Sequence, residues 1–331
     1  MSAAPCIEVR DLAKHYPVRR GLLRRTVGLV RAVDGVSFAL AHGETLALVG
    51  ESASGKTTVA RALLALTEPS AGSVYYRRSP DAPAVDLLAL RGAALRRVRR
   101  ELAIVFQDPF ESLNPRLAVG QALAEPLFVH GLARGAELSE RVVALLLRVG
   151  LTPDIAARFP HQLSGGQRQR VAIARALALA PRFIVCDEAV SALDASVQAQ
   201  ILNLLADVQR DLGLAQLFIA HDLALVRHVA ERVCVMQYGR IVESGTVAEV
   251  FSHPAHPYTR SLLEAAPGEG ARRPRAPAPL AERPSPSALP SGCPHRTRCP
   301  LADALCAERY PETATLSTTH SAACHHPLTD G

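Results

Sequence analysis

Two glycine-rich segments with the character of phosphate-binding loops constrain the fold of this chain more than any other feature. The first, GESASGKTT, runs from Gly50 to Thr58, and the second, LSGGQ, runs from Leu163 to Gln167. A strand-like apolar run, Thr45 to Val49, precedes the first loop, and a segment of helical spacing, Thr58 to Leu66, follows it. Within one compact domain the second loop cannot reach a nucleotide bound on the first. The pair therefore predicts a site that two chains complete.

The residue types of the first loop suit a nucleotide triphosphate. Backbone amides between a strand and a helix can wrap a β-phosphate, and the helix amino end adds partial positive charge. Lys56 would bridge the β- and γ-phosphates, and the Thr57 hydroxyl would ligate Mg²⁺. A chance glycine turn is the alternative, but such a pattern arises in about one chain in a hundred of this length. The expected nucleotide contacts here are Gly50, Glu51, Ser52, Ala53, Ser54, Gly55, Lys56, Thr57 and Thr58.

Adjacent carboxylates follow a second apolar run. Phe183 to Cys186 indicates a buried parallel strand, and Asp187 and Glu188 come directly after it. Asp187 would hold Mg²⁺ through water, and Glu188 would polarise the water that attacks the γ-phosphate. Such a pair alone is more often a solvated strand end. The catalytic interpretation of the pair depends on the other motifs in the chain. In chain order, these are Gln107, LSGGQ, SALD (Ser191 to Asp194) and His221.

The order and spacing of these motifs resemble the ATPase subunit of ABC transporters over nearly the whole chain. The resemblance implies that Gln107 contacts Mg²⁺ or the attacking water, that His221 contacts the γ-phosphate, and that Tyr16 stacks on adenine. A helix is expected after LSGGQ, because Gln169 to Ala180 has apolar positions at helical spacing. Its amino end would hold the γ-phosphate of the other subunit. The residues expected to act in trans are Leu163, Ser164, Gly165, Gly166, Gln167 and Asp194.

At two motif positions this chain has a residue that differs from the one usual in that family. Ala53 stands where the phosphate loop commonly has Gly or Cys, and Ala189 stands where Pro usually follows the glutamate. Neither change removes a charged or catalytic group, so we expect an active ATPase. Ala53 would matter only if its position needed a positive φ, where a Cβ costs on the order of 1 kcal/mol.

Composition limits the class of protein. The chain has 331 residues, 48% of them hydrophobic, which allows a large core plus an appendage. No run approaches eighteen uncharged apolar residues, and the start lacks the apolar core of a signal peptide, so we expect a cytosolic chain. The net charge of +6 gathers in Val18 to Arg31 and Arg91 to Arg100. Aromatic residues make up only 4%, which favours solvated faces or contacts near anionic lipid over nucleic-acid binding.

The expected fold class is α/β, with a P-loop ATPase core, an antiparallel β subdomain and a helical subdomain. We expect the ATPase domain over 1–250, with the helical subdomain at about 108–165. A C-terminal extension and Pro-rich linker would occupy 251–290, because Pro267 to Pro290 lacks periodicity. A cysteine-rich tail would occupy 291–331.

Three segments resemble the ATPases of oligopeptide, dipeptide and nickel importers. They are HPYT (His256 to Thr259), VFQDPFESLNPR (Val105 to Arg116) and the opening LAKHYPV, which is nearer to the second, F-type, ATPase of such importers. The resemblance implies a second homologous ATPase subunit in a heterodimer, two permease subunits and, indirectly, an extracytoplasmic solute-binding protein. It places the chain peripherally on the cytosolic face of a bacterial membrane. Nickel or glutathione is an alternative cargo, and a soluble ATPase of DNA repair or translation is an alternative class.

Four of the seven cysteines lie in the tail, at Cys293, Cys299, Cys306 and Cys324. Disulfides are not expected in the cytosol. A short segment with little hydrophobic core needs another cross-link, such as a bound metal, in order to fold. The spacing matches neither a CxxC zinc knuckle nor the ferredoxin run. It resembles the tail of peptide-importer ATPases, some of which hold a [4Fe-4S] cluster, while Zn²⁺ and no metal stay open. A metal site with both cysteine and histidine ligands is a further alternative, and its candidate histidines are His295, His320, His325 and His326.

Overall fold

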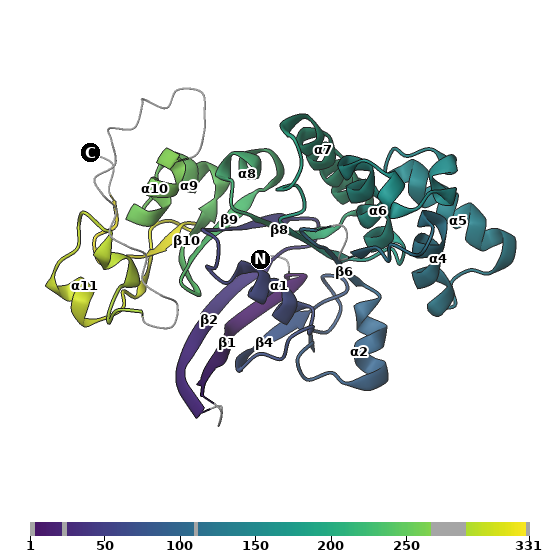
Figure 1. Ribbon diagram of the computed structural model, residues 1–331. Helices are drawn as coiled ribbons and strands as arrows, with labels where there is room; N and C mark the ends of the chain where they lie inside the picture. Colours follow the sequence, from purple (N-terminus) through teal and green to yellow (C-terminus); the bar gives the residue numbers. More distant parts are fainter. Residues whose placement is uncertain (1–3, 22–24, 109–111, 266–288, 329–331) are drawn as a thin grey trace.

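The computed structural model of the chain describes residues 4–21, 25–108, 112–265 and 289–328 (Figure 1). Most of the linker expected between Pro267 and Pro290 therefore lies outside the described residues, as do residues 109–111 of the VFQDPFESLNPR segment. The described residues form two β-sheets, a group of helices beside the larger sheet and a C-terminal lobe. This lobe comprises residues 247–265 and 289–328. The predicted α/β class is confirmed.

The larger sheet has eight strands in the order β11-β12-β10-β9-β3-β8-β7-β6. Strands β9, β3, β8, β7 and β6 are parallel to one another, and β10, β12 and β11 continue the sheet with antiparallel pairing. The strand bounds are β3 Thr45–Val49, β6 Leu102–Val105, β7 Phe183–Asp187, β8 Ala215–Ala220, β9 Arg232–Gln237, β10 Arg240–Thr246, β11 Thr313–Thr315 and β12 Ser321–Ala323.

Strand β3 shows why an unbroken apolar run forms a central strand here. All five of its residues are buried. Ala47 and Val49 belong to the hydrophobic cluster that includes the helical group, whereas Leu46 and Leu48 belong to the cluster on the other face. Because both faces are covered, the sequence shows no alternation of apolar and polar residues. The carboxyl ends of β3, β6, β7 and β8 meet at one edge of the sheet, which is where the motif residues follow.

A smaller antiparallel sheet, in the order β2-β1-β4-β5, packs on one side of this core. Helix α1 lies between the two sheets, since its buried residues join a cluster with residues of β1, β2, β3 and β7. Helix α2 carries Arg96, Arg97 and Arg99 of the basic segment and buries none of its residues. Arg96 and Arg97 are exposed, whereas Arg99 is half-buried and donates to the carbonyl oxygen of Ala65 at 2.7 Å. The bounds are β1 Ile7–Arg20, β2 Arg25–Leu40, β4 Ala71–Tyr76, β5 Val85–Asp86, α1 Lys56–Leu63 and α2 Gly92–Arg99.

Helices dominate the segment between Gln107 and LSGGQ, and its described residues contain no strand. Leu123 and Leu146, from two of these helices, lie in one buried cluster with Ile173 of the helix that LSGGQ opens. Figure 1 shows the group beside the β6 end of the larger sheet. The bounds are α4 Val119–Val129, α5 Gly135–Arg148, η1 Pro153–Ala157, η2 Pro160–Gln162, α6 Gly165–Leu177 and α7 Ala195–Leu212, with α8 Leu223–Val229 after β8.

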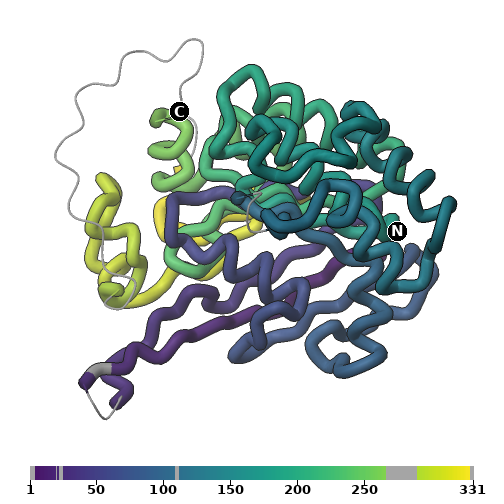
Figure 2. Tube along the Cα trace, turned by 45° about the vertical axis from the view of Figure 1, so that its right-hand side comes forward, coloured from purple at the N-terminus to yellow at the C-terminus, as the bar shows by residue number. Residues whose placement is uncertain are grey.

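The C-terminal lobe is joined to the core sheet, which the sequence did not indicate. Strand β12 pairs with β10 through Glu243↔Ala322 and Ser244↔Ser321. The buried carboxylate of Glu243 also accepts hydrogen bonds from the amides of Ala255 (2.8 Å) and His256 (2.9 Å). Figure 2 shows this lobe against the end of the sheet that carries β10. Its other elements are α9 Val247–Ser252, α10 Pro257–Ala265, η3 Pro294–Thr297 and α11 Ala304–Glu308.

Over the described residues, none of the helices combines the length and the apolar character that a membrane crossing requires.

Candidate functional site

The first glycine-rich loop connects β3 to α1 and fits closely against neighbouring backbone. Gly50 has φ 153° and Gly55 has φ 109°. A Cβ at Gly50 would lie 2.1 Å from the carbonyl oxygen of Met236, and one at Gly55 would lie 2.0 Å from that of Ala32. Only glycine allows this approach, so the loop is held against β9 and β2.

Ala53 has φ 65°, in the left-handed region. Its methyl group is exposed, so no packing compensates for the conformation. Alanine in place of glycine at position 53 therefore costs about 1 kcal/mol or more of conformational free energy in the folded loop.

Lys56 is buried inside the curve of the loop, with 4% of its side chain exposed. Its ammonium donates to the carbonyl oxygens of Gly50 (2.8 Å) and Glu51 (3.0 Å). Burial lowers the pKa of Lys56, while the nearby carboxylates of Glu188 and Asp187 oppose this shift. The loop thus holds a buried cation whose partners are mostly carbonyl oxygens, which suits the binding of an anion.

Thr57 and Asp187 meet although they are far apart in the sequence, because β3 and β7 end at the same sheet edge. The Thr57 hydroxyl donates to Asp187 Oδ1 at 3.2 Å. Burial raises the pKa of Asp187, and the hydrogen bond from Thr57 partly offsets that shift. A carboxylate and a hydroxyl are the hard oxygen donors that Mg²⁺ prefers, so the pair fits this ion.

Glu188 lies between a cation and an imidazole. Its Oε1 is 3.9 Å from Lys56 Nζ, and its Oε2 is 3.5 Å from Nδ1 of His221. The backbone of Glu188 has φ 48°, a strained conformation that turns the chain directly after β7. A cavity of about 430 Å³ beside it is within the size range of small-molecule sites. Lys56, Thr57, Gln107 and Glu188 all line this cavity.

The cavity also has walls that the sequence did not indicate. They come from Val30 to Ala32 of β2 and from Tyr238 and Gly239 in the turn between β9 and β10. Tyr16, the expected adenine-stacking residue, lies on β1 and is not among the lining residues. The residue is 41% exposed, and the Lys14 ammonium lies 5.0 Å from the centroid of its ring. Its predicted role stays a prediction.

The LSGGQ segment opens helix α6, as predicted. Ser164 is the N-cap: its hydroxyl accepts from the Gln167 amide at 3.2 Å, and its own amide donates to Gln167 Oε1 at 3.0 Å. Asp194 similarly caps α7, accepting from the Val197 amide at 3.0 Å. None of these residues lines the cavity that contains Lys56 and Glu188. Within one chain, the described residues do not bring the two phosphate-binding elements together.

The four tail cysteines do come together. Cys293, Cys299, Cys306 and Cys324 line one very small cavity, of about 10 Å³, along with His295, His325 and His326. Burial raises the pKa of Cys324 to about 11. His320 is not a lining residue and instead lies 2.8 Å from Glu243 Oε1. The other three cysteines, Cys6, Cys186 and Cys234, are buried in the core.

The donors in the tail can be tested against a zinc site. Four thiolates on Zn²⁺ would lie about 3.8 Å apart, given a Zn–S distance of about 2.3 Å. Among the described residues, the ligand atoms found within 4.8 Å of one another belong to Asp303, Cys306 and His326, and not to three cysteines. The thiols therefore share a cavity without the compact spacing of a closed tetrahedral site.

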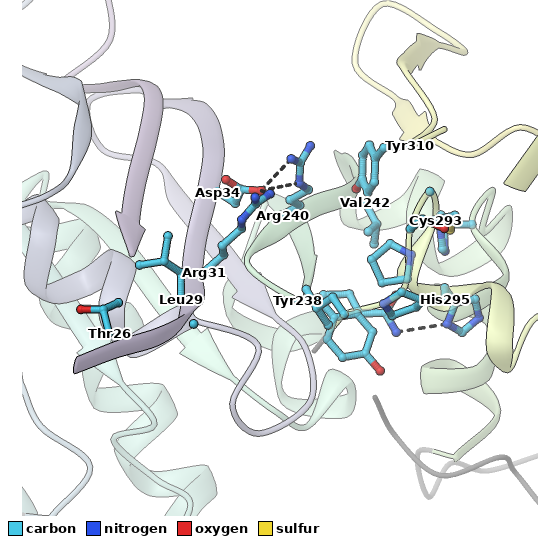
Figure 3. Close-up of a pocket in the computed structure, with 18 residues that line it drawn as sticks. Thr26, Leu29, Arg31, Asp34, Tyr238, Arg240, Val242, Cys293, His295 and Tyr310 are labelled. Carbon is cyan, nitrogen blue, oxygen red and sulfur yellow. Dashed lines mark hydrogen bonds and ion pairs between the residues drawn. The ribbon is translucent and has the colours of Figure 1, made fainter. Parts of the chain in front are cut away.

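A larger cavity, of about 650 Å³, lies next to the first and separates β2 from residues 289–295 (Figure 3). Asp34 accepts from Arg240 Nη2 at 2.6 Å, and the Arg240 guanidinium lies 4.3 Å from the Tyr310 ring centroid. Sequence analysis missed this cavity because its walls come from segments that are far apart in the chain.

Comparison with known proteins places these observations in context. The ABC transporter family matches residues 33–191, and the family described as "Oligopeptide/dipeptide transporter, C-terminal region" matches residues 242–306. The chain is 45% identical over 323 residues to the oligopeptide transport ATP-binding protein AppF of Bacillus subtilis, covering 96% of each chain. It is 47% identical over 320 residues to the probable peptide ABC transporter ATP-binding protein y4tS of Sinorhizobium fredii, covering 96% and 89% of the two chains.

Two further similarities extend the comparison. The chain is 52% identical over 265 residues to the glutathione import ATP-binding protein GsiA of Pectobacterium atrosepticum, which covers 80% of this chain and 42% of that protein. A solved structure of the ATP-binding cassette MJ0796, a dimer in a post-hydrolysis state bound to ADP and Pi, has a TM-score of 0.62 and 29% identity. It covers 73% of this chain and 98% of that one.

Proposed function

This chain belongs to the ATP-binding proteins of ABC transporters, and we propose that it is the ATP-hydrolysing subunit of an importer for di- or oligopeptides. The observation that carries the peptide assignment is the C-terminal extension, where residues 242–306 match the oligopeptide and dipeptide transporter region. Relatives named for peptide transport cover nearly the whole chain.

Lys56 and the loop amides bind the phosphates of ATP. Thr57 and Asp187 would hold Mg²⁺, and Gln107 lines the same cavity as Thr57. When bound, the ion neutralises charge on the phosphates. The carboxylate of Glu188 accepts a proton from the attacking water, and His221, 3.5 Å away, orients that carboxylate and contacts the γ-phosphate. Lys56 supplies the buried positive charge that stabilises the phosphates as they react.

The site is completed by a second cassette. Ser164, Gly165 and Gly166 lie at the amino end of α6, away from this chain's own cavity, and their amides suit a phosphate held by a partner. Asp194 caps α7 near the same surface, because the Cβ position of Gly166 is 2.6 Å from Val197 Cγ1. Loss of the γ-phosphate removes the shared contacts and opens the dimer.

The partners follow from this assignment. They are a second homologous ATPase, two permease subunits and an extracytoplasmic solute-binding protein, with the chain peripheral on the cytosolic face of the membrane. Co-expression with the permease subunits encoded nearby tests the assignment: the chain should co-purify with them and support ATP-dependent peptide uptake in proteoliposomes. A chain that hydrolyses ATP yet never associates with a permease would contradict it.

Glutathione is the second candidate cargo, because the similarity to GsiA spans 80% of this chain. The ATPase subunit does not contact the cargo, so its own residues discriminate poorly between the two. The solute-binding protein of the same transporter would decide the question by calorimetric titration with dipeptides, oligopeptides and glutathione. Nickel would be tested in the same titration.

We also propose that the tail binds a [4Fe-4S] cluster through Cys293, Cys299, Cys306 and Cys324. Support comes from the four thiols, which line one cavity. The cluster would supply a covalent staple to a lobe that has little core of its own. Anaerobic purification followed by iron, sulfide and zinc analysis tests this proposal. About four irons per chain, lost in Cys299→Ser, is the expected result, and one zinc or no metal contradicts it.

A further inference from the structure

The C-terminal lobe contacts the phosphate loop directly. The backbone amide of Glu51, the second residue of that loop, donates to the hydroxyl of Tyr258 at 2.8 Å. Tyr258 belongs to the HPYT segment at the start of α10 and is 1% exposed. A buried phenol is thus used to hold the start of the loop, 207 residues away in the sequence.

A second contact reaches Glu51 from residues 289–328, the part of the C-terminal lobe that holds the four tail cysteines and is called the cysteine-rich lobe. Nη1 of Arg298 lies 3.5 Å from Oε2 of Glu51, and only 9% of the Arg298 side chain is exposed. Its Nε and Nη1 atoms have no hydrogen-bond partner within the described part of the chain. A buried guanidinium needs a negative partner, so the carboxylate of Glu51 compensates its charge.

The two contacting residues are held by packing within the lobe and by a contact with β9 of the core sheet. The His295 ring meets the Tyr258 ring edge-on, with centroids 5.6 Å apart, and His295 Nδ1 lies 3.1 Å from Gln237 Nε2. The Arg298 amide donates to the His295 carbonyl at 2.9 Å, and Arg298 directly precedes Cys299. Because Cys299 lines the thiol cavity, the position of Arg298 depends on the fold of the cysteine-rich lobe.

We propose that Tyr258 and Arg298 are positioning residues of the nucleotide site, which hold Glu51 so that the cysteine-rich lobe sets the loop's affinity for ATP. Neither residue lines the nucleotide cavity, so they act through the loop and not on the nucleotide. A loop that is already ordered loses less conformational entropy when it binds phosphate. Releasing Glu51 therefore weakens ATP binding, while Glu188 and its chemistry stay in place.

The proposal rests on the assignment of the phosphate loop as the ATP site, and it is tested in the complete transporter. Arg298→Gln and Tyr258→Phe should each raise the KM for ATP by about fivefold or more and leave kcat within about twofold. Matched controls are Arg309→Gln, which changes an exposed arginine in the same lobe, and Tyr76→Phe, which removes a phenol hydrogen bond to Glu101. Both controls should keep the parental KM.

A double-mutant cycle separates positioning from a general loss of structure. Glu51→Gln and Arg298→Gln should not be additive, because either change breaks the same ion pair. The exchanged pair Glu51→Arg with Arg298→Glu should recover part of the lost affinity. Additive effects with no recovery, or a KM for Arg298→Gln and Tyr258→Phe equal to that of the controls, would overturn the proposal.

Lys56→Ala distinguishes this failure from a failure of the site itself. If Lys56→Ala abolishes binding of a fluorescent ATP analogue while the Tyr258 and Arg298 variants match their controls, the ATP site stands and only the positioning role is wrong. If Lys56→Ala binds the analogue normally, the assignment of the loop as the ATP site is wrong.

Discussion

Replacing Ala53 with glycine should not destabilise the chain, which is unusual for an alanine-to-glycine change. The positive φ of 65° at Ala53 costs an L-residue about 1–2 kcal/mol, and glycine removes this cost. Glycine also gives the unfolded chain more freedom, which costs about 0.5–1 kcal/mol. The methyl group is exposed, so no packing is lost. The net expectation is a stabilisation of about 0.5 kcal/mol.

Ala199→Gly is the matched control. Ala199 is exposed in the second turn of α7, where glycine should destabilise by about 0.5–1 kcal/mol. The two variants should therefore differ by about 1–1.5 kcal/mol with opposite signs. Urea unfolding followed by circular dichroism, with equal m-values, measures this difference. If Ala53→Gly loses as much free energy of unfolding as Ala199→Gly, the argument from backbone strain is wrong.

Three further changes test other parts of the account. Glu188→Gln should lower ATP turnover by about 10²-fold or more while ATP binding persists, and unchanged hydrolysis by a clean preparation would refute its role as the base. Gly50→Ala should abolish binding of labelled ATP, because its Cβ would lie 2.1 Å from a backbone oxygen, whereas parental affinity would show that the loop can move apart. Hydrogen bonds from Ser317 and then Thr246 lower the pKa of Glu249 to about 2. Its contribution is present above about pH 4.5 and is lost as pH falls towards 2, so Glu249→Gln should reduce the urea midpoint at pH 7 more than at pH 3. Equal reductions at both pH values would contradict this.

The meeting of Thr57 and Asp187 could be predicted because both lie near the carboxyl ends of strongly apolar strands. Asp187 is the last residue of the fully buried strand β7, and Thr57, the second residue of α1, follows the fully buried strand β3 by way of the glycine-rich loop. Parallel strands carry both residues to one edge of the sheet. The hydroxyl and carboxylate therefore meet without any long-range information. The sequence shows that a positive φ at Ala53 would be costly, but it does not show whether φ is positive there. That angle depends on how the loop packs against β2 and β9.

The attachment of the tail could not be predicted. Strand β12 pairs with β10 at two residue pairs, which is too short a segment to produce a pattern in the sequence. The ion pair between Arg298 and Glu51 joins two residues that are 247 positions apart (298 − 51), and nothing in the sequence around either residue indicates the pair. The HPYT segment did point to Tyr258, but only as part of a subfamily resemblance and not as a contact to the phosphate loop.

We propose that one chain builds only part of the nucleotide site. ATP turnover per chain, measured across a dilution series with the association state followed by analytical ultracentrifugation, tests this most directly. We expect turnover to rise with the fraction of dimeric cassettes, either with a second copy or with the homologous partner, and to be negligible for the monomer. Full turnover by a strict monomer, independent of concentration, would contradict the central claim.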